Sequence, residues 1–66
     1  MSLKKQLIIY LKNRREYISK AEIEQFGESL GFLGDNVARR CRELQNEGVF
    51  ERKKQGKSIA YKYHIN

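Results

Sequence analysis

The side chains in this 66-residue chain that can do the most evident chemistry are arginines and one asparagine in its middle third. Arg39 and Arg42 are three positions apart, and Asn36 precedes them by one further helical turn. A guanidinium can donate two hydrogen bonds to O6 and N7 of a guanine, and an asparagine amide can pair in the same way with adenine. On a helix, Arg39 and Arg42 share the outward side and Asn36 flanks it. These three residues are therefore candidates for contacts with base edges, and the alternative is a solvated helix face whose arginines pair with Glu43 and Glu47.

Four further basic residues are crowded within six positions near the C-terminal end of the chain. They are Arg52, Lys53, Lys54 and Lys57. Basic side chains at the tip of a hairpin suit phosphate oxygens or the minor groove. The alternative is an exposed hairpin that its charge keeps soluble. Arg40 lies at the edge of an apolar stripe, where it can either reach a phosphate or form a salt bridge with its stem on the core.

No group of residues suggests catalysis, a metal site or a cofactor. Cys41 occupies an apolar helix position without a second cysteine or a histidine near it in sequence, so we expect it in the core. His64 stands alone. The acidic side chains of Glu22, Glu24 and Glu28 are expected on the outer face of a helix. They do not line a catalytic cleft, because so short a chain does not enclose one. The sequence predicts a protein that is not an enzyme and takes no metal, cofactor or small-molecule ligand.

Charge is distributed unevenly along the chain. Residues 1–15 hold five basic and no acidic side chains, residues 16–33 one basic and four acidic, and residues 34–66 eight basic and four acidic. The net charge of +6 and its asymmetry indicate one face that meets an anionic partner. A single cysteine argues against a disulfide scaffold, and we see neither a secretion signal nor a membrane span. We therefore expect a cytoplasmic, nucleoid-associated protein.

Three helices are expected in the first two thirds of the chain. Apolar residues recur at helical spacing, Ser2 and Ser19 stand as N-caps, and Ser19 with Glu22 forms a capping box. Gly31 and Gly48 are expected to end the second and third helices. The predicted helices cover about residues 3–14, 20–30 and 35–47.

The pattern changes to period two after Gly48. It predicts strands over 49–53 and 58–65 with a turn at Gln55-Gly56, and Tyr17-Ile18 can add a short third strand. One face of the second strand carries Ile59, Tyr61, Tyr63 and Ile65, and the other carries Ser58, Ala60, Lys62 and His64. The strand tyrosines are interpreted as core residues, with a base-stacking platform as the alternative. Tyr10 and Tyr17 are left open between packing and phosphate contact.

Over its whole length, 1–66, the chain resembles the winged helix-turn-helix family. The most specific stretch is FGESLGFLGDNVARRCRELQNEGVF, residues 26–50. Gly27, Gly31 and Val37 match the small residue, the turn glycine and the aliphatic residue of that family. Because glycine costs a helix about 1 kcal/mol relative to alanine, Gly27 suggests that the third helix crosses close above it. Most relatives have Ser or Thr where Leu33 stands, so Gly34 or Asp35 is expected to cap the third helix.

The resemblance implies an α+β fold: a three-helix bundle with a helix-turn-helix, followed by a two-stranded β-hairpin wing, in one domain. It implies sequence-specific binding of double-stranded DNA and transcriptional regulation, with residues 35–47 in the major groove and residues 50–62 on the backbone or minor groove. Two alternatives remain open. One is a protein-contact module of a homodimer or larger assembly, motivated by the acidic second helix. The other is binding of RNA or single strands through the tyrosine face.

Overall fold

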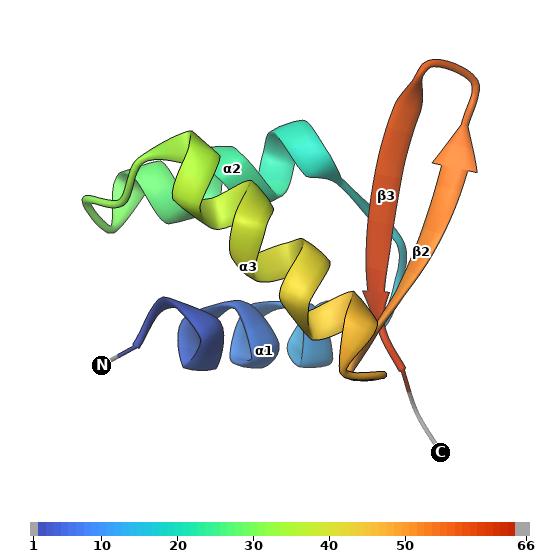
Figure 1. Cartoon of the computed structure of the whole chain (residues 1–66), viewed down its shortest axis with the longest axis horizontal. Helices are drawn as coiled ribbons and strands as arrows, with labels where there is room; N and C mark the ends of the chain where they lie inside the picture. The colour runs from blue at the N-terminus through green and yellow to red at the C-terminus, as the bar shows by residue number, and fades with distance from the viewer. Residues whose placement is uncertain (1, 65–66) are drawn as a thin grey trace.

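The computed structural model describes residues 2–64, which form three helices and a three-stranded antiparallel sheet (Figure 1). In chain order the elements are α1 (Leu3–Arg14), β1 (Ile18–Ser19), α2 (Lys20–Ser29), α3 (Gly34–Asn46), β2 (Phe50–Gln55) and β3 (Ser58–Tyr63). This small α+β arrangement is compatible with a winged helix. The three predicted helices and the hairpin are confirmed; the first helix has the predicted bounds, and the bounds of the other elements differ by at most two residues.

The sheet contains the two predicted strands of the hairpin and the third short strand that the sequence allows. Its strand order is β1-β3-β2, so the short β1 pairs with the outer edge of the hairpin. The pairing joins Ile18 to Tyr61 and Ser19 to Ala60, one residue later than the predicted Tyr17-Ile18 strand. Backbone hydrogen bonds to β1 give β3 a partner on both sides, which anchors the base of the hairpin to the helices. The predicted place of Ile65 on the apolar face lies outside the described residues.

Serine side chains begin the first two helices, as the sequence indicates. Ser2 Oγ accepts a hydrogen bond from the Lys5 amide, and Ser19 Oγ accepts one from the Glu22 amide, each over 3.2 Å. The Glu22 carboxylate does not complete the capping box among the described contacts. It accepts instead from the Tyr10 hydroxyl at 3.2 Å, which ties α2 to α1.

The core takes one apolar stripe from each helix. Its largest fully buried side chains are Leu7, Leu11, Ile23, Val37, Cys41 and Leu44. The sheet closes this core with Ile18, Phe50 and Tyr61, each about 2% exposed. Burial of Cys41 and Tyr61 confirms that both are core residues. Tyr10 also packs, with its ring stacked on Phe26 at 4.0 Å between centroids.

The turn between α2 and α3 ends α2 as expected, but it starts α3 differently from the prediction. Gly31 has φ of +93°, the left-handed conformation predicted for the end of the second helix. The third helix begins at Gly34, and its N-cap is Leu33, which has no side-chain oxygen to accept a hydrogen bond. The expectation that Gly34 or Asp35 would cap this helix is therefore wrong. The first turn of α3 lacks the side-chain cap that α1 and α2 possess.

Candidate nucleic-acid interface

The outward side of α3 carries two exposed arginines with no carboxylate partner. Arg39 and Arg42 are both exposed, and neither lies within 4.0 Å of an acidic oxygen in residues 2–64. The alternative in which Glu43 and Glu47 pair with these arginines is not observed. Both guanidinium groups are free to form the two parallel hydrogen bonds that planar acceptors such as guanine accept.

Glu43 and Glu47 instead join α3 to α1. Lys4 Nζ lies 2.7 Å from a Glu47 carboxylate oxygen and 3.4 Å from one of Glu43. Arg40 contacts the same Glu43 carboxylate at 2.6 Å. The hydrogen bond from Arg40 lowers the pKa of Glu43, and Lys4 acts in the same direction. Arg40 thus forms the salt bridge that was one of its two predicted roles, on the side of α3 that faces α1.

Asn36 belongs to that same side of the helix. It is exposed, and Arg40 and Glu43 follow it at i+4 and i+7, which places the three residues along one face. Arg39 and Arg42 lie on the outward side of α3, so the three candidate base contacts are not equivalent.

Strand alternation divides the basic residues of the hairpin between two faces. Arg52 is opposite Tyr61 and Lys54 is opposite Ile59, and both partners point to the core side of the sheet. Lys53 is opposite Ala60 on the other face. Cross-strand partners share a face in an antiparallel pair. Arg52 and Lys54 therefore project on the side where α3 lies, and Lys53 projects away from it.

Arg42 of α3 and Arg52 of β2 both act electrostatically on the Tyr61 phenol. Burial raises the pKa of Tyr61, and the positive charges of Arg52 and Arg42 both oppose that rise. The two guanidinium groups belong to different elements, but both act on one phenol. No spacing in the sequence relates these two residues.

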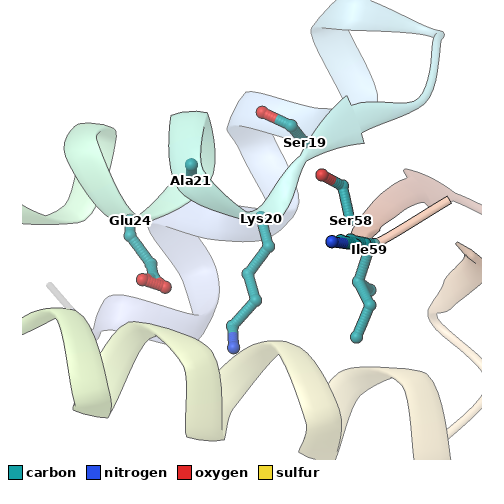
Figure 2. Close-up of a pocket in the computed structure, with 7 residues that line it drawn as sticks. Ser19, Lys20, Ala21, Glu24, Ser58 and Ile59 are labelled. Carbon is teal, nitrogen blue, oxygen red and sulfur yellow. The ribbon is translucent and has the colours of Figure 1, made fainter. Parts of the chain in front are cut away.

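A hollow of about 270 Å³ lies beside this basic surface, between the start of α2 and the hairpin. Figure 2 shows Lys20 and Glu24 extending from α2 toward α3, with Ser58 and Ile59 across from them. Lys57, in the hairpin turn, also lines the hollow. Sequence reasoning missed Lys20 because it is the single basic residue in an acidic segment. Its position directly after the cap Ser19, at the positive end of the helix dipole, was the available signal.

The opposite end of α3 is acidic. A Cβ built on Gly34, the first residue of α3, would lie 3.7 Å from a Glu28 carboxylate oxygen and 3.8 Å from one of Glu24. Asp35 follows in the first turn. Carboxylates at a helix N-terminus stabilise the helix through its dipole, and their negative charge repels phosphate. The arginines of α3 without ion pairs in residues 2–64, Arg39 and Arg42, lie beyond this acidic end.

Other kinds of site find little support in the structure. Cys41 is buried, and burial raises the pKa of its thiol to about 12. Within residues 2–64, histidine, cysteine and acidic side chains form no group of three that can hold a metal ion. None of the described helices is long and apolar enough to cross a membrane. The basic surface of α3 and the hairpin is the strongest candidate site.

Comparison of the chain with protein-family models, with curated proteins and with solved structures finds no match. The interpretation of this surface accordingly depends on the geometry and electrostatics of the chain itself.

Proposed function

We propose that this chain is a winged-helix domain that binds double-stranded DNA in a sequence-dependent manner, as a transcriptional regulator does. In this proposal the middle of α3 enters the major groove, and the β2–β3 hairpin contacts the backbone or the minor groove. A helix of 13 residues spans about 20 Å, and the major groove of B-DNA admits a helix. Arg39 and Arg42 would then meet base edges.

The observation that carries the proposal is a group of five basic residues without ion pairs in residues 2–64 on the surface of α3 and the hairpin. Lys4, Arg14 and Arg40 are bound to carboxylates around α1. The basic residues of the α3 and hairpin surface have no acidic partner within residues 2–64. They are Arg39, Arg42, Arg52, Lys54 and Lys57. A cluster of unneutralised cations on one side of a small domain is the expected footprint of a polyanion.

Each group has a distinct role in the proposal. The α3 arginines read bases, and Arg52 and Lys54 on the core side of the hairpin neutralise phosphates. Lys57 and Lys20 flank the hollow between α2 and the hairpin, where they can meet the sugar-phosphate strand that separates the two grooves. In this proposal Lys53, on the other face of the hairpin, takes no part in the contact.

Two measurements test the proposal together. Selection from random duplexes should enrich a short motif, and binding to that motif should weaken with salt. About four phosphate contacts predict a slope of log K against log salt near −3.6. Binding without any enriched motif would leave only non-specific association. Absence of duplex binding at low salt would contradict the proposal.

The alternative of base stacking on the tyrosine face meets an obstacle. Tyr61 is only 2% exposed, so its ring cannot receive a base without opening the core. Tyr63 is half-buried on the same face. The sheet therefore offers no continuous aromatic platform of the kind that RNA-binding sheets use.

A further inference from the structure

Three carboxylates around the α2–α3 turn have no ion-pair partner within residues 2–64. Glu24 and Glu28 lie beside the first residue of α3, and Asp35 is in its first turn. The remaining acidic residues all lie within ion-pair distance of a basic group. They are Glu16, Glu22, Glu43, Glu47 and Glu51. A chain of net charge +6 thus keeps one local negative patch unneutralised.

The same turn exposes two leucines. Leu33 is 72% exposed and Leu30 is 45% exposed. Leu33 also occupies an N-cap position, where it makes no side-chain hydrogen bond. Neither packing within the chain nor capping of α3 accounts for an apolar residue there. We call the combination of the three acids with these two leucines the turn patch.

A surface of complementary character lies on the outer face of the sheet. Tyr17 is 36% exposed, and the ammonium groups of Lys53 and Lys62 lie 5.4 and 5.7 Å from the centre of its ring. Neither lysine lies within 4.0 Å of a carboxylate oxygen in residues 2–64, and Glu51, directly opposite Lys62, pairs with His64 instead. An apolar ring between two free cations can receive leucine side chains and carboxylates together. We call Tyr17, Lys53 and Lys62 the sheet patch.

We propose that the turn patch of one copy of this chain binds the sheet patch of another copy. Both patches combine apolar surface with charge, and their charges are opposite. Of the four large exposed apolar residues among residues 2–64, three lie in these patches and only Ile9, on α1, lies outside. We choose a second copy as the binding partner, because each patch finds a surface of opposite charge on the same chain.

The two patches lie on opposite sides of the molecule, since the α2–α3 turn and the sheet are far apart in Figure 1. Contact between unlike surfaces is heterologous, so repeated contacts build an open chain of copies rather than a closed dimer. Neither patch includes Arg39, Arg42, Arg52 or Lys54. Glu24 of the turn patch also lines the hollow beside Lys20 and Lys57, so association is tested without DNA.

The test uses charge reversal and sedimentation equilibrium on the full chain. Wild type should form dimers and longer species as its concentration rises to about 1 mM, where a contact with a Kd of that order is substantially populated. Reversal of the turn patch (Glu24→Lys with Glu28→Lys) should weaken association by more than about tenfold. Reversal of the sheet patch (Lys53→Glu with Lys62→Glu) should do the same. An equimolar mixture of the two variants should associate again, because each then meets an opposite charge.

A second pair of variants excludes misfolding as the cause of any loss. Leu33→Ser removes apolar surface from the turn patch but supplies a capping hydroxyl, so it should raise the thermal midpoint while it weakens association. Ile9→Ser removes a similarly exposed side chain outside both patches and should leave association unchanged. Circular dichroism verifies that each variant is folded.

Several results would overturn the proposal. A wild type that stays monomeric up to about 1 mM has no such contact. Association that survives in either charge-reversed variant alone points to contact between like patches. A monomeric wild type whose Lys53→Glu, Lys62→Glu variant loses duplex binding makes the sheet patch a nucleic-acid surface instead.

Discussion

Gly27 of α2 lies directly against Val37 of α3, and a Cβ at position 27 would overlap Cγ2 of that valine. The two helices cross at this point with both residues fully or almost fully buried. Close approach of two helices requires a residue without a side chain on one of them. The glycine therefore sets the angle and distance at which α3 is presented, and the position of the candidate interface depends on it.

Gly27→Ala is expected to destabilise the fold by about 1–3 kcal/mol, although alanine favours a helix over glycine by about 1 kcal/mol. The reason is overlap with Val37, which is fully buried and cannot move aside. Urea unfolding of the two proteins measures the difference. Gly34→Ala is the matched control, since a Cβ there meets only carboxylate ends at ordinary distances. Equal or greater stability of Gly27→Ala would show that the helices do not cross so closely.

Leu33→Ser should stabilise the protein by about 1 kcal/mol, because a serine hydroxyl at an N-cap can accept from a free amide of the first turn. Leu33 is the cap of α3 and is mostly exposed, so its removal costs little packing. Thermal unfolding at a fixed protein concentration tests this expectation. An unchanged or lower midpoint would mean that the leucine makes contacts that stabilise the turn.

Cys41 should resist thiol reagents in the native protein, because its side chain is 1% exposed and its pKa is raised to about 12. At pH 8 only about one thiol in ten thousand is then ionised, and the thiolate is the reacting species. Alkylation should proceed mainly through unfolded molecules and accelerate in urea. Rapid labelling without denaturant would contradict the burial of Cys41.

The same thiol makes the free energy of unfolding depend on pH in the alkaline range. Its pKa is raised from 9.0 in the unfolded chain to about 12 in the fold, so the folded state retains the proton longer. The contribution is fully present below pH 9 and is lost as pH rises toward 12. Cys41→Ala should lose about 1 kcal/mol at neutral pH through a small cavity. It should also decline less steeply than wild type above pH 9, and parallel declines would assign the effect to other groups.

Arg39→Ala or Arg42→Ala should each weaken binding to the selected duplex by about 1–3 kcal/mol and relax preference at one base position. Both side chains are exposed without ion pairs, so the free energy of unfolding should change by less than about 0.5 kcal/mol. Arg40→Ala is the control on the same helix, since Arg40 is bound to Glu43 on the side facing α1. Titration of labelled duplex measures all three. Equal losses for Arg40 and Arg42 would refute the orientation proposed for α3.

Lys54→Gln and Lys53→Gln should differ although the residues are neighbours. Lys54 projects on the core side of the hairpin toward α3, whereas Lys53 is opposite Ala60 on the outer face. Loss of one phosphate contact lowers the salt slope by about 0.9. Lys54→Gln should show that change for all duplexes, and Lys53→Gln should show almost none. A reversed or equal response would mean that the outer face of the hairpin meets the nucleic acid.

Much of the local structure could be predicted from the sequence, because it depends on short-range chemistry. Ser2 and Ser19 mark helix starts through hydrogen bonds within one turn. Gly31 and Gly48 mark ends because both adopt positive φ. The apolar period placed Val37, Cys41 and Leu44 in the core. The Leu33 cap was missed, since a backbone turn can start a helix without a capping side chain.

The sequence identified the residues of the candidate interface but not their contacts with other segments. Residue types and helical period singled out Arg39 and Arg42, and period two alone implies that Lys53 and Lys54 face opposite ways. Which side chains contact one another depended on contacts between segments that are distant in the sequence. Pairing of β1 with β3 created an outer face on which Tyr17 meets Lys53 and Lys62. Packing of α1 on α3 brought Lys4 to the carboxylates of Glu43 and Glu47. Such long-range contacts arise from the packing of whole elements, which no spacing along one segment encodes.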